Sequence, residues 1–416
     1  MFCTPARKSL LLRIQHLFLV AVTAIFPTCL LSSAATVEHA GTAVARVYVA
    51  EPNSILGYTA AADGTLTAIP GSPFPISVFG LAVTGTYLFG SSFDGVHVNS
   101  YRIQSNGSLV FATSTDINQF NSGSKCPNLQ ASPLVLDHTG ATLYTVAYHG
   151  SVCNSTSYKS FAIDKTTGGL TYLGDSGTRL VWNFPLRFSA DNRFAYGAGC
   201  VGGLTTPFWA ESFGILKRNP NGRLIYINAS APKPPTKDNT YFFCRNLTAA
   251  DPADNLIVGV VKLDARSTSL FNHGTLLANY HIQSNGSLTT TSRYNNMPWV
   301  SKVGEVEDLQ MSPSGKFIAV AGSDGLMVYH ANGGQHPTRY TGLLTSDLIE
   351  ETFWDNANHL YAVSLFGELH VFTITANSYS EAPGSPYSIP AGGFDIPMIV
   401  RPLSAEPVAK PSQAAE

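Results

Sequence analysis

The sequence has few charged residues and no excess of basic ones. Asp, Glu, Lys and Arg make up 12% of the 416 residues, with 25 basic side chains against 27 acidic ones. Binding to nucleic acid requires clustered Lys and Arg that neutralise phosphates, so we expect no nucleic-acid partner. Gly, Ser, Thr, Asn and aromatic residues are plentiful instead, and this composition favours short strands and tight turns over helices.

Several catalytic and metal-binding motifs are also absent. Neither Gly-x-Ser-x-Gly nor His-Glu-x-x-His occurs, so serine-hydrolase and zinc-protease mechanisms lack their signatures. No Cys-x-x-Cys pair is present to hold a tetrahedral metal ion. We therefore expect no cofactor, with a calcium ion as the one alternative left open.

Long apolar runs are missing except at the N-terminus. Arg7, Lys8 and Arg13 precede an apolar run at 17–31, which ends in Ser33-Ala34-Ala35. This is the pattern of a cleaved signal peptide over residues 1–35, and the run is shorter than the about 20 residues that span a bilayer. We predict a secreted or periplasmic protein without a stable membrane anchor; a retained N-terminal anchor is the alternative. Removing three basic residues leaves 22 Lys and Arg against 27 acidic residues, a net charge of −5.

Two hairpin patterns repeat along the chain. One is a strand, an Asn-Gly or Asp-Gly turn and a second strand, as in Tyr101–Leu109 and Tyr280–Leu288. The other is seen in Leu309–Val320 and Leu186–Tyr196. Together they predict four-stranded antiparallel units spaced as in β-propellers, near residues 79–117, 131–177, 184–231, 246–293, 306–344 and 350–387.

The two ends of the mature chain complete a seventh unit. The segment 46–66 contains three strands without an inner strand, whereas 397–402 is a strand without a blade. Pairing them removes the exposed sheet edges. We predict an all-β protein in which 36–403 form a single seven-bladed β-propeller, with 404–416 as a disordered tail.

The turn at 312–317 and the hairpin at 161–170 resemble the blade pattern of lactonase-type seven-bladed propellers, the family that includes the bacterial 6-phosphogluconolactonases and a fungal muconate-cyclising enzyme. The resemblance covers almost all of the mature chain and implies a propeller that opens cyclic esters. The family's Gly-Pro-Arg-His segment corresponds to 183–187 here, which lacks the histidine, and its Val-Asn-Glu corresponds to the region of 196–199, which lacks the Asn-Glu. This departure indicates a substrate other than a phosphorylated sugar.

Four cysteines remain after the signal peptide, and an even number in an oxidising compartment permits two disulfides. Cys126 and Cys244 precede inner strands, and Cys153 and Cys200 follow second strands. We favour Cys126 with Cys153 and Cys200 with Cys244; Cys153 with Cys200 is the alternative.

The leading ends of the inner strands should ring the mouth of the central channel. Aligning the blades places polar and acidic residues at or near this position: Asn183, Phe184, Arg245, Asn246, Glu307, Asp308, Glu350, Glu351 and Asp395. Arg187 follows in the same strand as Phe184, and His149 and Trp182 lie in loops that could reach the mouth.

Three interpretations of this ring remain. Glu307 or Glu351 could act as a general base while Arg245 or an asparagine stabilises the oxyanion of an attacked ester. The crowded carboxylates could instead bind calcium, or the channel could be an ordinary solvated one. Our leading hypothesis is a monomeric lactonase-like hydrolase that acts on a small-molecule lactone, with Asn183, Phe184, Arg187, Asn246, Asp308, Glu350, Asp395, His149 and Trp182 contacting the substrate. The alternative is a non-catalytic propeller that binds a glycan or a protein.

Overall fold

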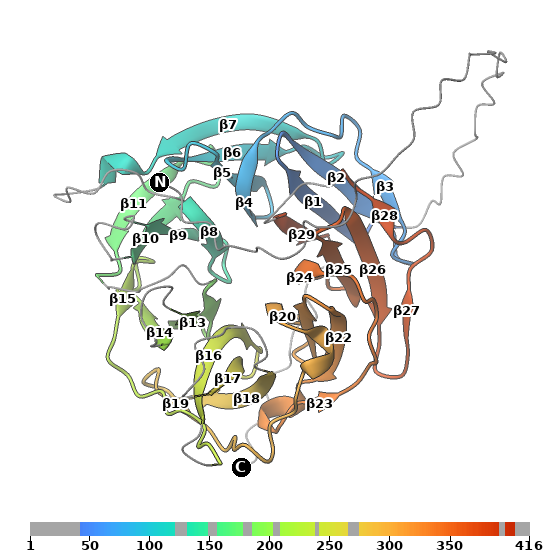
Figure 1. Ribbon diagram of the computed structural model, residues 1–416. Helices are drawn as coiled ribbons and strands as arrows, with labels where there is room; N and C mark the ends of the chain where they lie inside the picture. The colour runs from blue at the N-terminus through green and yellow to red at the C-terminus, as the bar shows by residue number, and fades with distance from the viewer. Residues whose placement is uncertain are drawn as a thin grey trace, which may run out of the picture. The chain divides into compact units, whose positions relative to one another are not determined.

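The chain folds into seven small antiparallel sheets arranged as a ring (Figure 1). The computed structural model describes residues 42–120, 131–148, 156–177, 185–202, 209–237, 241–264, 274–390 and 396–403. Its helical elements within these ranges are the short 3-10 turns η1 (Asn118–Phe120), η2 (Ser301–Val303) and η3 (Asn332–Gly334). The prediction of an all-β, seven-bladed propeller is confirmed.

Each blade is a sheet whose strands follow one another from the inside of the ring outward, and we number the blades in chain order. Blade 1 consists of β29 (Met398–Pro402), β1 (Ala45–Glu51), β2 (Ser54–Ala60) and β3 (Leu66–Ala68). Blade 2 consists of β4 (Val78–Val83), β5 (Tyr87–Ser92), β6 (His97–Ile103) and β7 (Leu109–Asp116). Blade 3 consists of β8 (Ala131–Leu136), β9 (Thr142–Tyr148), β10 (Thr156–Ile163) and β11 (Leu170–Asp175). Blade 4 consists of β12 (Arg187–Phe188), β13 (Phe194–Gly202), β14 (Trp209–Arg218) and β15 (Leu224–Tyr226).

The remaining blades follow the same order. Blade 5 consists of β16 (Tyr241–Ala250), β17 (Asn255–Asp264), β18 (Thr275–Ile282) and β19 (Leu288–Thr289). Blade 6 consists of β20 (Val306–Met311), β21 (Phe317–Gly322), β22 (Gly325–His330) and β23 (Thr338–Arg339). Blade 7 consists of β24 (Ile349–Trp354), β25 (His359–Ser364), β26 (Glu368–Ile374) and β27 (Tyr379–Glu381), with β28 (Tyr387–Ser388) also pairing with β26.

The ring is closed by the two ends of the propeller. β29 pairs antiparallel with β1, so that Val400 lies opposite Val47 and Met398 lies opposite Val49. These four side chains are buried in one cluster with Tyr361 and other residues of blade 7. Because β29 fills the innermost position of blade 1, the predicted closure by the C-terminal strand is confirmed.

The turns between inner and second strands of blades 3 to 7 share one backbone conformation. Each turn begins with Asp or Ser, whose side chain or backbone forms a hydrogen bond across the turn. The residue three positions later has a positive φ. Asn, Asp and Gly tolerate this left-handed conformation at low cost, and they occupy it here: Gly140, Asn192, Asp254, Gly315 and Asn358, with φ between 58° and 69°. Local turn chemistry therefore sets the register of each inner hairpin.

The outer hairpins attach each blade to the one before it. The Tyr48 hydroxyl donates to the carbonyl of Gly107 at 2.8 Å, and Tyr144 and Tyr196 donate likewise to Gly222 and Gly286 in the following blades. A Cβ at Gly107 would lie 2.8 Å from Ile69 Cδ1, and its φ is +94°. Glycine is thus required both by the turn and by the close approach of the two blades.

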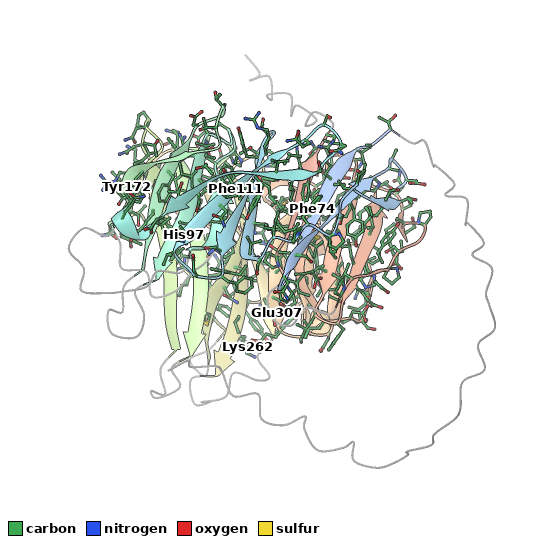
Figure 2. All side chains as sticks on the ribbon, turned by 90° about the horizontal axis from the view of Figure 1, so that it is seen from above. Phe74, His97, Phe111, Tyr172, Lys262 and Glu307 are labelled. Atoms are coloured by element: carbon green, nitrogen blue, oxygen red, sulfur yellow. A yellow bond between two sulfur atoms is a disulfide. The ribbon has the colours of Figure 1, made fainter. Side chains whose placement is uncertain are left out.

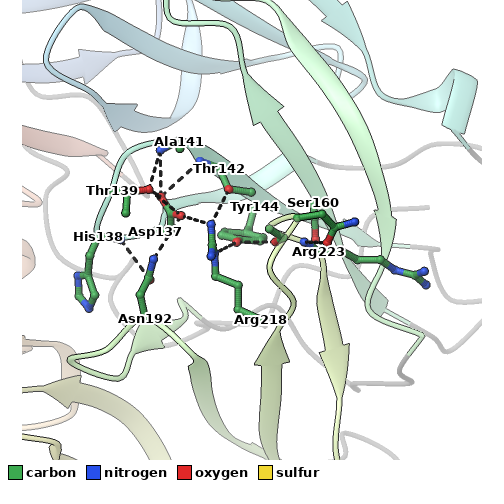
Figure 3. A network of polar contacts seen from close by, with 12 residues as sticks. Asp137, His138, Thr139, Ala141, Thr142, Tyr144, Ser160, Asn192, Arg218 and Arg223 are labelled. Carbon is green, nitrogen blue, oxygen red and sulfur yellow. Dashed lines mark hydrogen bonds and ion pairs between the residues drawn. The ribbon is translucent and has the colours of Figure 1, made fainter.

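A buried ion pair joins blades 3 and 4 (Figure 3). The Arg218 guanidinium lies 2.6 Å from Asp137 Oδ2 and also donates to the Tyr144 hydroxyl at 3.0 Å. Asp137 Oδ1 accepts from the backbone N–H groups of Ala141 and Thr142 at 3.0 and 3.3 Å. The Asp137 carboxylate is fully buried, and these bonds satisfy it.

Some of the predictions concern residues outside the described ranges. These are the signal peptide at 1–35, the tail at 404–416 and the residues Cys126, Cys153, His149, Trp182, Asn183, Phe184 and Asp395. They stay predictions. In the part of the chain that the structure describes, no helix is long and apolar enough to cross a membrane.

Candidate functional site

The leading ends of three inner strands carry polar side chains at one equivalent position. Asn246, Asp308 and Glu351 each pair with the fifth residue of the second strand of their blade, namely Gly259, Ala321 and Val363. In a propeller the inner strands line the channel, so this position marks a ring of polar groups on blades 5, 6 and 7.

A bulge precedes or follows each of these residues. The register shifts between Asn246 and Thr248, between Val306 and Asp308, and between Ile349 and Glu351. Bulges insert one residue and redirect the neighbouring side chain. Glu307 and Glu350 are the inserted residues on blades 6 and 7, and Glu307 is exposed, on the same face of the ring as Lys262 (Figure 2).

Asp308 is the most buried acid of this ring, with 8% of its surface exposed. Its Oδ2 accepts hydrogen bonds from the backbone N–H of Thr352 at 2.8 Å and from the Thr352 hydroxyl at 2.7 Å. Its Oδ1 has a contact of 3.4 Å from Gln310 Nε2. Burial raises the pKa of the Asp308 carboxyl, and the charge of Arg187 and the bonds from Thr352 oppose that rise without cancelling it.

Glu351 is partly buried and accepts a short hydrogen bond from the backbone N–H of Met398 through Oε2. Met398 belongs to β29, the inner strand of the next blade, just as Thr352 lies in the blade after Asp308. Each carboxylate thus uses one oxygen to hold the neighbouring inner strand.

Arg187 supplies the positive charge that faces these acids. It lies in β12 of blade 4 and is partly buried. Its position in the inner strand is two residues beyond the position that Asp308 and Glu351 occupy in theirs. Burial lowers the pKa of the guanidinium, whereas the charges of Asp308 and Glu351 raise it. Since blade 4 adjoins neither blade 6 nor blade 7, this interaction crosses the channel.

The Arg187 guanidinium has an unusual environment for a covered cation. Within the described ranges, Arg187 forms no hydrogen bond or ion pair within ordinary contact distance. The charges that act on it most are those of the Asp308 and Glu351 carboxylates. An anionic or strongly polarised oxygen could bind there.

Arg245 and Asn246 point away from this group. Arg245 is 6% exposed, donates to the carbonyl of Ala231 at 2.8 Å and stacks over the Phe213 ring at 4.1 Å. Asn246 Oδ1 lies 3.4 Å from the backbone N of Cys200. The structure therefore brings together Asp308, Glu351 and Arg187 and places Arg245 beside the junction of blades 4 and 5.

A disulfide joins blades 4 and 5 near the same junction. Cys200 of β13 is bonded to Cys244 of β16, with Cα atoms 5.6 Å apart and a separation of 44 positions along the chain. The sequence predicts Cys200 after a second strand and Cys244 before an inner strand. Both cysteines instead lie inside their strands, because β13 and β16 are longer than predicted. The disulfide thus links two adjacent blades and holds Arg245 and Asn246 in place.

One buried acid was missed by the sequence analysis. Glu51 ends β1 of blade 1, is 4% exposed, and its Oε1 has no hydrogen-bond partner. Burial raises its pKa from 4.5 to about 7. A charged residue closing the apolar run Val47–Ala50 is the signal that could have indicated it.

Comparisons with known proteins show where this architecture recurs. No protein-family model matches the chain, and no curated protein matches it. Solved structures do: two putative 6-phosphogluconolactonases, from Bacteroides fragilis and Bacteroides uniformis, share 12% and 13% sequence identity with it, with TM-scores of 0.58 and 0.57. The match covers 86% of this chain in both cases, and 98% and 99% of those chains. The chain has the fold of the lactonase-like propellers.

The same fold also occurs in a protein that is not described as a lactonase. A hypothetical selenium-binding protein from Sulfolobus tokodaii has a TM-score of 0.54 and 9% identity, over 88% of this chain and 94% of its own. These identities show the fold alone. The function must therefore be argued from the side chains of this propeller.

Proposed function

We propose that this lactonase-like propeller hydrolyses a cyclic ester in its channel, with Arg187, Asp308 and Glu351 as the reacting site. The observation that carries the proposal is the covered guanidinium of Arg187, which faces two carboxylates across the channel and has no ion-pair partner among the described residues. The lactonase-like fold of the Bacteroides proteins supports the substrate class.

The chemistry follows from the charges. Water attacks the carbonyl carbon of the lactone while Asp308 accepts a proton from it, because burial raises the pKa of that carboxyl and so makes its carboxylate a stronger base. Arg187 stabilises the negative charge that develops on the carbonyl oxygen. The ring C–O bond then breaks, the proton passes to the leaving oxygen, and a hydroxy acid is released.

Glu351 has a second role in this scheme. It lies on the same ring of the channel as Asp308, and both interact with the guanidinium of Arg187. Its negative charge raises the pKa of Arg187 and so helps to keep the guanidinium charged. The product carboxylate is repelled by the two acids, which helps its release.

The test is an assay of the mature chain, residues 36–416, against a panel of sugar and aromatic lactones. Asp308→Asn keeps an oxygen that can accept from Thr352, and we expect it to lower turnover by about 10²- to 10⁴-fold. Glu351→Gln and Glu307→Gln test the two remaining acids. Glu305→Gln, an exposed neighbour outside the ring, is the control and should retain full activity.

A second function is favoured by a specific observation. Asp308 and Glu351 each accept a backbone N–H of the next inner strand, which is the arrangement expected of residues that only brace the ring. The protein would then be a non-catalytic propeller that binds a glycan or a protein. Lactone hydrolysis no faster than in buffer, together with retention of a glycan or protein ligand, would establish this alternative and reject the first. The proposed location, outside the cytoplasm, rests on the predicted signal peptide.

A further inference from the structure

A buried histidine on the outer part of blade 7 lies among three carboxylates. His370 of β26 is 4% exposed, and its ring is parallel to that of Phe372, with centroids 5.7 Å apart and an interplanar angle of 6°. Its Nδ1 lies 3.0 Å from Glu381 Oε1. An ionised carboxylate only accepts hydrogen bonds, so Nδ1 donates to Glu381, and in the neutral imidazole Nε2 then presents a lone pair.

That Nε2 atom is buried and has no hydrogen-bond partner. It lies 3.0 Å from Asp347 Oδ2 and 3.7 Å from Glu368 Oε2. A deprotonated nitrogen and a carboxylate oxygen are both acceptors and cannot bond to each other. The ligand atoms of all three residues lie within 4.8 Å of one another, so three lone-pair donors converge on one point.

The charge of the cluster is not balanced by basic side chains. Asp347, Glu368 and Glu381 surround a single imidazole, and within the described part of the chain their only ion-pair contacts are with His370. A cation at the point of convergence would satisfy both the charges and the orphaned Nε2.

We propose that Asp347, Glu368 and His370 bind a divalent transition-metal ion, zinc being the best fit. Zinc binds imidazole nitrogen and carboxylate oxygen at about 2.0–2.2 Å in a tetrahedron, which separates neighbouring ligand atoms by about 3.3–3.5 Å for bonds of that length. The observed separations of 3.0 and 3.7 Å bracket this value. A mixed imidazole and carboxylate set disfavours calcium and magnesium, which prefer oxygen ligands alone.

The surroundings of the ligands also suit a metal. Glu381, which orients the imidazole, accepts a hydrogen bond from the Ser385 hydroxyl at 2.8 Å. The Thr345 hydroxyl donates to Asp347 Oδ2. Such carboxylate–histidine–metal arrangements fix the tautomer and raise ligand basicity. The side chains of Asp347 and Glu368 are 36% and 42% exposed, so an ion can enter from solvent and water can take the fourth position.

The topology shows what the ion would connect. Glu368 and His370 are two residues apart on β26 and therefore project from the same face of the strand. Asp347 lies in the connection from blade 6 to β24. The metal would hold this connection against the third strand of blade 7, on the side of the ring where the inner strands begin.

The experiment is a titration of the untagged, chelator-treated mature chain with zinc chloride, followed by calorimetry and by elemental analysis after gel filtration. We expect one zinc per chain. Glu368→Gln should weaken binding about 100-fold, and Glu381→Gln, which removes the group that orients the imidazole, about 10- to 100-fold. His97→Ala is the matched control, because His97 contacts a single carboxylate, that of Asp94.

A second measurement avoids any substitution of the buried His370. Cobalt(II) bound to the unmodified chain should give visible ligand-field absorption that zinc displaces, and Glu368→Gln, whose carboxylate is partly exposed, should abolish it while melting normally. The proposal would be overturned if the unmodified chain failed to bind zinc at millimolar concentration, if Glu368→Gln and Glu381→Gln bound zinc as tightly as the unmodified chain, or if His97→Ala lost as much affinity as they do.

Discussion

Glu51 provides a stability prediction whose size follows from the structure. Its carboxyl is 4% exposed, one oxygen has no partner, and burial raises its pKa from 4.5 to about 7. In the folded protein the carboxyl therefore keeps its proton at pH values where the unfolded chain has lost it. Stability from this group is present below about pH 4.5 and is lost as pH rises toward 7.

The size of this stability change follows from the shift of the Glu51 pKa. One pKa unit corresponds to 1.36 kcal/mol, so a rise from 4.5 to about 7 costs up to about 3 kcal/mol at pH 8. Glu51→Gln removes the charge and keeps the shape. We expect the variant to match the unmodified protein at pH 4.5 and to be more stable by up to about 3 kcal/mol at pH 8.

Urea unfolding at a series of pH values measures this difference directly. Glu305→Gln is the matched control, since Glu305 is an exposed glutamate, and its difference from the unmodified protein should stay near zero throughout. A Glu51→Gln difference that does not grow with pH would refute the assignment of a buried, unpaired acid at this position.

Three further predictions concern the ring itself. Deleting 398–403 removes β29 and the inner edge of blade 1, and the melting temperature should collapse; unchanged melting would refute closure by the termini. Asp137→Asn leaves Arg218 partly buried without its counter-charge and should cost about 3–5 kcal/mol in urea unfolding, whereas Asp137→Asn with Arg218→Met should cost less than the sum of the two single changes. Cys200→Ser opens the disulfide to Cys244, which closes a 44-residue separation, and should lower the free energy of unfolding by about 4 kcal/mol; equal stability of the two forms under oxidising conditions would contradict this.

The repeat architecture could be predicted from the sequence because it depends on local turn chemistry. Gly315 and Asn192 occupy the left-handed position of the inner hairpins, and Gly107 and Gly222 occupy the turn of the outer ones. Each choice is visible in a few neighbouring residues. The number of blades and the closure then follow from counting these turns, without any knowledge of how distant side chains meet.

The site could be predicted only in part, because strand alternation and bulges decide which side chain enters the channel. Aligning the blades places Glu307 and Asp308, and likewise Glu350 and Glu351, at or near one position, and the pairing of the strands shows that Asp308 and Glu351 are the equivalent residues. Arg245 and Asn246 precede a bulge, and Arg245 stacks on Phe213 instead of facing the acids. The interaction of Arg187 with Asp308 crosses the ring between blades that are not adjacent, and no local pattern signals it.

The most direct test of the proposed function is the value of kcat/KM for a lactone in the Arg187→Gln variant. Arg187 has no hydrogen bond or ion pair with another described residue, so its replacement should leave the melting temperature nearly unchanged. If the guanidinium stabilises the oxyanion, kcat/KM should fall by about 10²- to 10³-fold. A folded variant that hydrolyses the lactone as fast as the unmodified protein would contradict a reacting site at Arg187, Asp308 and Glu351.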